Sequence, residues 1–137
     1  MDSKALVGVV VVAHGRLGHE LVAVARTIVE EIEHIVPVSI GWHDEVEEDG
    51  KRIEKAVAQV DAGRGVILLT DMFGGTPSNV ALSLLKKGER EIITGVNLPM
   101  LIKLAEQSGD ESLAELAVMV REQGKRQISI ASELLGE

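Results

Sequence analysis

The sequence predicts an α/β fold with a doubly wound, mostly parallel four-stranded sheet that is flanked by helices. Short runs rich in Val and Ile alternate along the chain with amphipathic stretches of helical spacing. Several of these runs lack polar alternation, which is typical of parallel strands covered on both faces. The four predicted strands are Leu6–Ala13, Ile35–Trp42, Gly65–Asp71 and Glu91–Val96.

The segments between these strands have the periodicity of helices. After the first strand, an apolar stripe at helical spacing predicts a helix that packs on the sheet through Leu17, Leu21, Val24, Ile28 and Ile32. Further helices are predicted over Glu45–Val60, Pro77–Lys87, Pro99–Gln107 and Glu111–Glu122. A short fifth strand is predicted at Gln127–Ala131.

Length and composition narrow the class of protein. A chain of 137 residues without a low-complexity linker or repeat predicts a single domain over 1–137. The net charge of −8 and the near absence of aromatic residues argue against a nucleic-acid partner. The lack of cysteine excludes disulfides and thiolate chemistry. The apolar run Leu6–Ala13 is too short to span a membrane, so we expect a cytoplasmic protein.

Two polar residues stand where predicted strands end. His14 directly follows the first strand, and Asp71 ends the third. If the second and third strands lie on opposite sides of the first, both residues flank the crevice at the topological switch point of the sheet. The sequence therefore predicts a functional site that contains His14 and Asp71.

The chemistry of this pair favours phosphoryl transfer. A neutral imidazole is a competent nucleophile toward phosphorus when one ring nitrogen carries the lone pair and the other is held as N–H. A carboxylate such as Asp71 can accept that N–H, which orients the ring and stabilises positive charge on it. We therefore expect His14 to be the nucleophile that is phosphorylated, and we expect Asp71 to orient its ring and to favour positive charge on it.

A glycine turn completes the predicted site. The stretch Gly74–Pro77 reads as a turn into a helix, with Thr76 at the N-cap and Pro77 at the first helical position. Free amide N–H groups and the helix dipole at such an end bind phosphoryl oxygens without a metal ion or other cofactor. Phosphoryl binding is assigned to Gly74, Gly75 and Thr76, although Thr76 can instead serve only as the cap.

Three segments together resemble the signature segments of phosphotransferase system (PTS) IIA domains of the mannose/fructose/sorbose family. They are Val12-Ala13-His14-Gly15, Thr70-Asp71-Met72-Phe73-Gly74-Gly75-Thr76-Pro77-Ser78-Asn79 and Gly95-Val96-Asn97-Leu98-Pro99-Met100. The resemblance implies that His14 accepts a phosphoryl group from phospho-HPr, on the ring nitrogen farther from the backbone, and passes it to a IIB component during sugar uptake. It also implies a homodimer in which the last strand is exchanged, and contact with the membrane only through the transporter complex.

Other readings remain beside this one. No IIB domain is seen within the chain, so a stand-alone IIA could instead be a regulatory binding module whose affinity for a target depends on phosphorylation. A response-regulator receiver needs an acidic pair where this chain has Ala13–His14, and an enzyme for a small molecule lacks a second acid–base group. His14 and Asp71 can also be a purely structural pair. The remaining histidines, His19, His34 and His43, are interpreted as surface residues, and a metal site is disfavoured.

Overall fold

The structure is a computed structural model that describes residues 5–30, 32–41, 45–72 and 82–136. Four parallel strands form one sheet in the order β2-β1-β3-β4, which confirms the predicted fold class and places β2 and β3 on opposite sides of β1. The strands are β1 Gly8–His14, β2 Ile35–Ile40, β3 Val66–Thr70 and β4 Arg90–Thr94. The helices are α1 Leu17–Ile28, α2 Val46–Val60, α4 Leu98–Ala105, α5 Leu113–Arg126 and α6 Ala131–Leu134.

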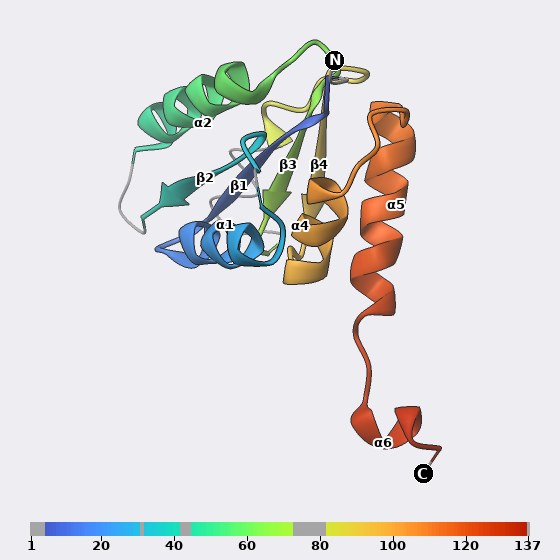
Figure 1. The fold of residues 1–137 in the computed structure, drawn as a ribbon. Helices are drawn as coiled ribbons and strands as arrows, with labels where there is room; N and C mark the ends of the chain where they lie inside the picture. Colours follow the sequence, from blue (N-terminus) through green and yellow to red (C-terminus); the bar gives the residue numbers. More distant parts are fainter. Residues whose placement is uncertain (1–4, 31, 42–44, 73–81, 137) are drawn as a thin grey trace.

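Helices cover both faces of the sheet (Figure 1). The side chains of β1 alternate between the two faces, so Val9 and Val11 pack with α1, α4 and α5, whereas Val10 and Val12 pack with α2. All four of these valines are completely buried. Burial on both faces explains why the strands read as continuous apolar runs in the sequence.

Helix α1 packs on the sheet through a face that only partly agrees with the stripe that the sequence predicts. Its buried residues are Gly18, Val22 and Ala25, whereas Leu17, Val24 and Ile28 are 45%, 43% and 56% exposed. The buried residues follow the same helical spacing, and two of them are small enough to let the helix approach the sheet closely. The prediction is therefore wrong for Leu17, Val24 and Ile28, which lie toward solvent. It is confirmed for Leu21, which packs against the core, and for Ile32, which is buried in the core beyond the end of α1.

The chain between β3 and β4 tests the predicted helix Pro77–Lys87 only at its end. Most of that range lies outside the described residues. From Ser83 to Glu89 the chain forms turns, with an isolated bridge between Lys86 and Arg90 that leads into β4. The predicted helix therefore does not extend to Lys87, because the chain must turn there to enter the sheet.

The C-terminal segment is not a strand in this chain. Gln127 closes α5 and Ala131 begins α6, so the predicted strand Gln127–Ala131 does not form against this chain's own sheet. A strand requires a neighbouring edge to satisfy its backbone groups, and here the segment leads away from the body of the protein to α6 (Figure 1). No helix within the described ranges is long and apolar enough to cross a membrane.

Candidate active site

The carboxyl edge of the sheet brings the two predicted site residues together. His14 is the last residue of β1, and Asp71 directly follows β3. The two strands are neighbours in parallel register, with Val12 opposite Thr70. Because β2 lies on the other side of β1, the pair sits where the strand order reverses, which is the usual location of sites in open α/β sheets.

The carboxylate of Asp71 holds both the ring and the backbone of His14. Its Oδ2 atom lies 2.8 Å from His14 Nδ1 and accepts the backbone N–H of His14 at 3.0 Å. The side chains of His14 and Asp71 are only 15% and 12% exposed. When Nδ1 donates to the carboxylate, the lone pair of the neutral imidazole resides on Nε2, and an imidazole in this tautomer can act as a nucleophile through that nitrogen.

Hydrogen bonding keeps Asp71 ionised despite its burial. Burial raises the pKa of this carboxyl, but the hydrogen bonds from the backbone and ring of His14, the charge of His14 and the backbone N–H of Met72 together outweigh it. The pKa of Asp71 therefore lies below its ordinary value. At neutral pH the site contains a carboxylate that stabilises positive charge on the imidazole.

The third sequence segment, 95–100, supports the strand that carries Asp71. The backbone N–H groups of Gly95 and Val96 both donate to the carbonyl of Thr70 at 2.9 Å. Asn97 caps α4 by accepting the backbone N–H of Met100 at 3.2 Å, and its amide donates to Gly124 of α5 at 3.1 Å. The sequence indicated that this segment mattered but not that its role is to brace the end of β3 and join α4 to α5.

The other predicted residues have different outcomes. Gly74, Gly75 and Thr76 lie outside the described residues, so their phosphoryl contact stays a prediction. His43 also lies outside them, and His19 is exposed on α1 as predicted. His34 was interpreted as a surface residue, but it is half-buried, with Nε2 3.1 Å from the carbonyl of Leu104. In the described part of the chain, no group of three or more His, Asp or Glu side chains is placed to hold a metal ion.

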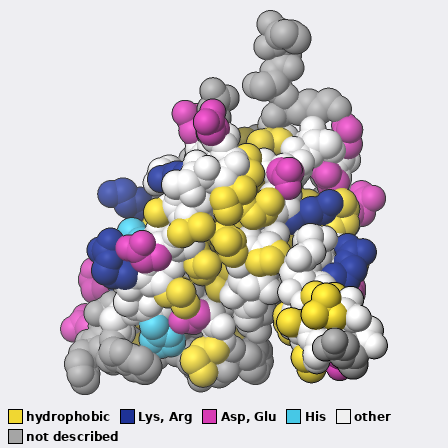
Figure 2. All heavy atoms as spheres, turned by 60° about the horizontal axis from the view of Figure 1, so that its bottom comes forward, with side chains coloured by type: hydrophobic (Ala, Val, Ile, Leu, Met, Phe, Trp, Pro, Cys, Tyr) yellow, Lys and Arg dark blue, Asp and Glu magenta, His cyan; other side chains and the backbone are white. Residues whose placement is uncertain are grey.

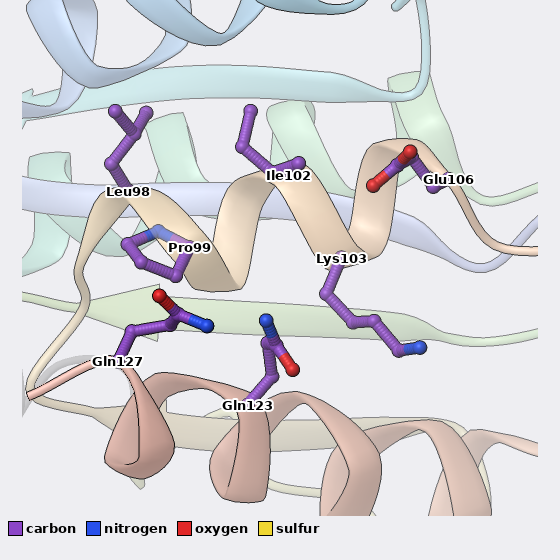
Figure 3. A pocket seen from close by; sticks show the side chains of 7 residues that line it. All are labelled: Leu98, Pro99, Ile102, Lys103, Glu106, Gln123 and Gln127. Atoms are coloured by element: carbon purple, nitrogen blue, oxygen red, sulfur yellow. The ribbon is translucent and has the colours of Figure 1, made fainter.

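A separate groove of about 380 Å³ lies between α4 and α5. In Figure 3, Pro99 and Lys103 extend from α4 toward α5, and Gln123 and Gln127 extend from α5 toward α4. Neither His14 nor Asp71 lines this groove. The groove between α4 and α5 is therefore separate from the His14–Asp71 pair at the sheet edge.

Comparisons with known proteins agree with this geometry. Residues 8–121 match the family described as PTS system fructose IIA component. The chain is 32% identical over 126 residues to the PTS mannose-specific EIIAB component of Escherichia coli strain K12; the match covers 87% of this chain but only 38% of that protein. The PTS fructose-specific EIIA component of Bacillus subtilis strain 168 is 24% identical, over 95% of this chain and 90% of its own length.

A solved structure shows the same fold. The crystal structure of the PTS IIA protein associated with the fucose utilization operon from Streptococcus pneumoniae superposes with a TM-score of 0.81. The two sequences are 26% identical, and the match covers 97% of this chain and 99% of that chain. The similarity therefore includes the strands and helices that form the His14–Asp71 edge.

The titration of Asp71 tests the hydrogen bonds at this edge. We expect ¹³C NMR to give a carboxyl pKa below the ordinary value for Asp71, and we expect His14→Ala to raise it because the ring hydrogen bond is lost. Since the pKa is lowered on folding, Asp71 stabilises the fold above about pH 4, and this stabilisation is lost as the pH falls through the folded-state pKa. Glu54, whose pKa is lowered by its hydrogen bonds with Arg90, is the matched control and should not respond to His14→Ala. If the pKa of Asp71 were the same in the wild type and in His14→Ala, the hydrogen bond from the His14 ring would not be what lowers it.

Proposed function

Because this chain belongs to the family of PTS system fructose IIA components, we propose that it carries a phosphoryl group on His14, from phospho-HPr to a IIB component of a sugar phosphotransferase system. The observation that carries the proposal is the 2.8 Å contact between His14 Nδ1 and Asp71 Oδ2 at the switch point of the sheet. The family makes the chain a component of a phosphotransferase, and this contact supports Nε2 of His14 as the atom that would receive the phosphoryl group.

The transfer follows from the chemistry of the imidazole. The lone pair of Nε2 attacks the phosphorus of the donor's phosphohistidine, and the donor's N–P bond breaks as the new Nε2–P bond forms. Positive charge develops on the His14 ring, and the Asp71 carboxylate stabilises it through Nδ1–H. In the next step the acceptor's histidine attacks the same phosphorus, and the electron pair of the Nε2–P bond returns to His14.

The proposed transfer requires no metal ion or other cofactor. The phosphoryl oxygens would be bound by backbone N–H groups at Gly74, Gly75 and Thr76, as a helix N-terminus binds anions. The carrier would work in the cytoplasm and would reach the membrane only through the transporter complex.

An apolar rim beside His14 would serve as part of the protein-docking surface. Leu17 and Met72, each within three residues of the catalytic pair in sequence, are 45% and 56% exposed. Figure 2 faces the side of the molecule toward which the strand arrows of Figure 1 point, and it shows hydrophobic side chains gathered there. Exposed apolar side chains near His14 and Asp71 in the sequence would favour contact with a partner protein.

We also propose that the protein is a homodimer in which segment 127–130 adds to the sheet of a second copy. Strand β4 is one of the two edges of the described sheet, and a cleft lined by Ile92, Ile93 and Val118 lies beside it. In the C-terminal segment, Ile128 and Ile130 are 76% and 61% exposed. An unpaired edge strand and an exposed apolar segment that is expected to be a strand are complementary.

Phosphorylation tests the carrier role directly. After incubation with phosphoenolpyruvate, Enzyme I and HPr, we expect the intact mass to increase by one acid-labile phosphoryl group. His14→Ala should abolish the gain because the accepting nitrogen is lost, whereas His19→Ala, which removes an exposed histidine of α1, should retain it. Absence of a gain in folded wild-type protein, or a gain in His14→Ala, would sink the assignment.

The docking role of Met72 is tested by a charge substitution. We expect Met72→Glu to raise the KM for phospho-HPr about tenfold and to leave kcat within about twofold, because an apolar contact is lost without a change in the chemistry. Leu85→Glu is the matched control. Leu85 is also exposed, at 50%, but it precedes the amino end of β4, whereas His14 and Asp71 lie at the carboxyl edge of the sheet. Equal KM values for the two variants would argue against docking at Met72.

The dimer is tested by its mass in solution. We expect light scattering to give twice the mass of the 14.7 kDa chain, and we expect the double substitution Ile128→Asp, Ile130→Asp to give a monomer. The aspartates place charge where apolar residues would be buried against the second copy. Val46→Asp, at an exposed apolar position on α2, should leave the mass unchanged. A monomeric wild type, or a dimer that survives the double substitution, would refute the exchange.

A further inference from the structure

The residue after His14 is held at both ends by strand β2. Gly15 adopts a left-handed backbone conformation with φ of +55°, which is unfavourable for residues that carry a side chain. Its backbone N–H donates to the carbonyl of Ile40 at 3.1 Å, and its carbonyl accepts the hydroxyl of Ser39 at 2.6 Å. The first contact continues the parallel ladder of the sheet. The second depends on one side chain, that of Ser39.

We propose that Ser39 is a positioning residue for the chemistry of His14 and acts through the Gly15 carbonyl. This inference rests on the proposed function, because it concerns the same transfer. Asp71 fixes His14 from the β3 side, and Ser39 fixes the following turn from the β2 side. The direction of the imidazole depends on the backbone at both places, so loss of either contact allows Nδ1 to move away from the carboxylate.

Ser39 is itself anchored by α2. Its carbonyl accepts a hydrogen bond from Arg52 Nη1 at 2.7 Å, and Arg52 Nη2 donates to Asp49 Oδ1 at 2.6 Å. The Asp49 side chain is completely buried, whereas that of Arg52 is 46% exposed. A buried carboxylate is tolerated only when it is paired, so the ion pair restrains Arg52 and thereby the backbone at Ser39. The turn after His14 is thus tied to the first turns of α2.

The alternative is that the Ser39 hydroxyl merely satisfies a carbonyl and contributes only to stability. A structural hydrogen bond affects unfolding but not the chemistry at His14. A positioning hydrogen bond affects the rate of phosphoryl transfer at a saturating concentration of the donor, and it affects which tautomer the His14 imidazole adopts. The two roles are therefore separable by experiment.

The experiment measures the kinetics of phosphoryl transfer from phospho-HPr for four proteins. They are the wild type, Ser39→Ala, Ser39→Thr and Ser112→Ala. Ser112 is the matched control because its hydroxyl also makes a hydrogen bond to the backbone, accepting the N–H of Glu115 at 3.1 Å to cap α5. It lies with Gly65 at the amino end of β3, the end of the strand opposite to Asp71. We expect Ser39→Ala to lower kcat about tenfold with KM unchanged, Ser39→Thr to restore it by returning the hydroxyl, and Ser112→Ala to retain the wild-type kcat.

A second measurement uses the unphosphorylated protein. In ¹⁵N NMR of histidine-labelled protein, we expect neutral His14 to carry its proton on Nδ1 in the wild type and in Ser39→Thr, and to average between both tautomers in Ser39→Ala. If the wild type accepts phosphoryl but Ser39→Ala transfers it as fast as the wild type or Ser112→Ala, the positioning role is overturned while the carrier role stands. If the wild type accepts no phosphoryl group, the carrier role fails. In that case an unchanged tautomer in Ser39→Ala also overturns the role of Ser39.

Discussion

The hydrogen bond between His14 Nδ1 and Asp71 Oδ2 joins residues that are 57 positions apart in the chain, and it orients the imidazole at the edge of the sheet. It exists because β1 and β3 pair in parallel, with their carboxyl ends at the same edge. The valines of β1, buried against helices on both faces, hold that pairing in place. The same carboxylate oxygen also accepts the backbone N–H of His14, so the ring and the main chain are restrained together.

The surroundings of this pair comprise hydrogen-bonded supports and exposed apolar side chains of α1. The segment that begins at Gly95 braces the end of β3 through the Thr70 carbonyl, and β2 braces the turn after β1. Helix α1 packs on the sheet through small residues and leaves larger apolar ones toward solvent. Hydrogen bonds from two neighbouring strand ends therefore restrain the backbone around His14 and Asp71, as precise positioning of a reactive side chain requires.

The central strands β1 and β3 were predictable because burial on both faces leaves a strong signal in the sequence, namely runs of Val, Ile and Leu without polar alternation. The packing face of α1 was not, since two stripes of helical spacing overlap in the same segment. Hydrophobicity alone predicts that Leu17 and Ile28 face the sheet. In the structure Gly18 and Ala25 face it instead, because these small residues let the helix approach the sheet closely. The C-terminal segment was not decided either, because a strand forms only beside a neighbouring edge, and segment 127–131 does not pair with the described sheet of its own chain.

The sequence alone determined the order of the four sheet strands and of α1, α2, α4 and α5, and it placed His14 and Asp71 at strand ends, because these features follow from local patterns of side chains. Only the tertiary structure decided that the carboxylate contacts Nδ1 at 2.8 Å, that Asn97 joins α4 to α5, and that Ser39 reaches the Gly15 carbonyl. These contacts join segments distant in the chain. Their geometry depends on strand register and on how closely each helix approaches the sheet, which no local pattern encodes.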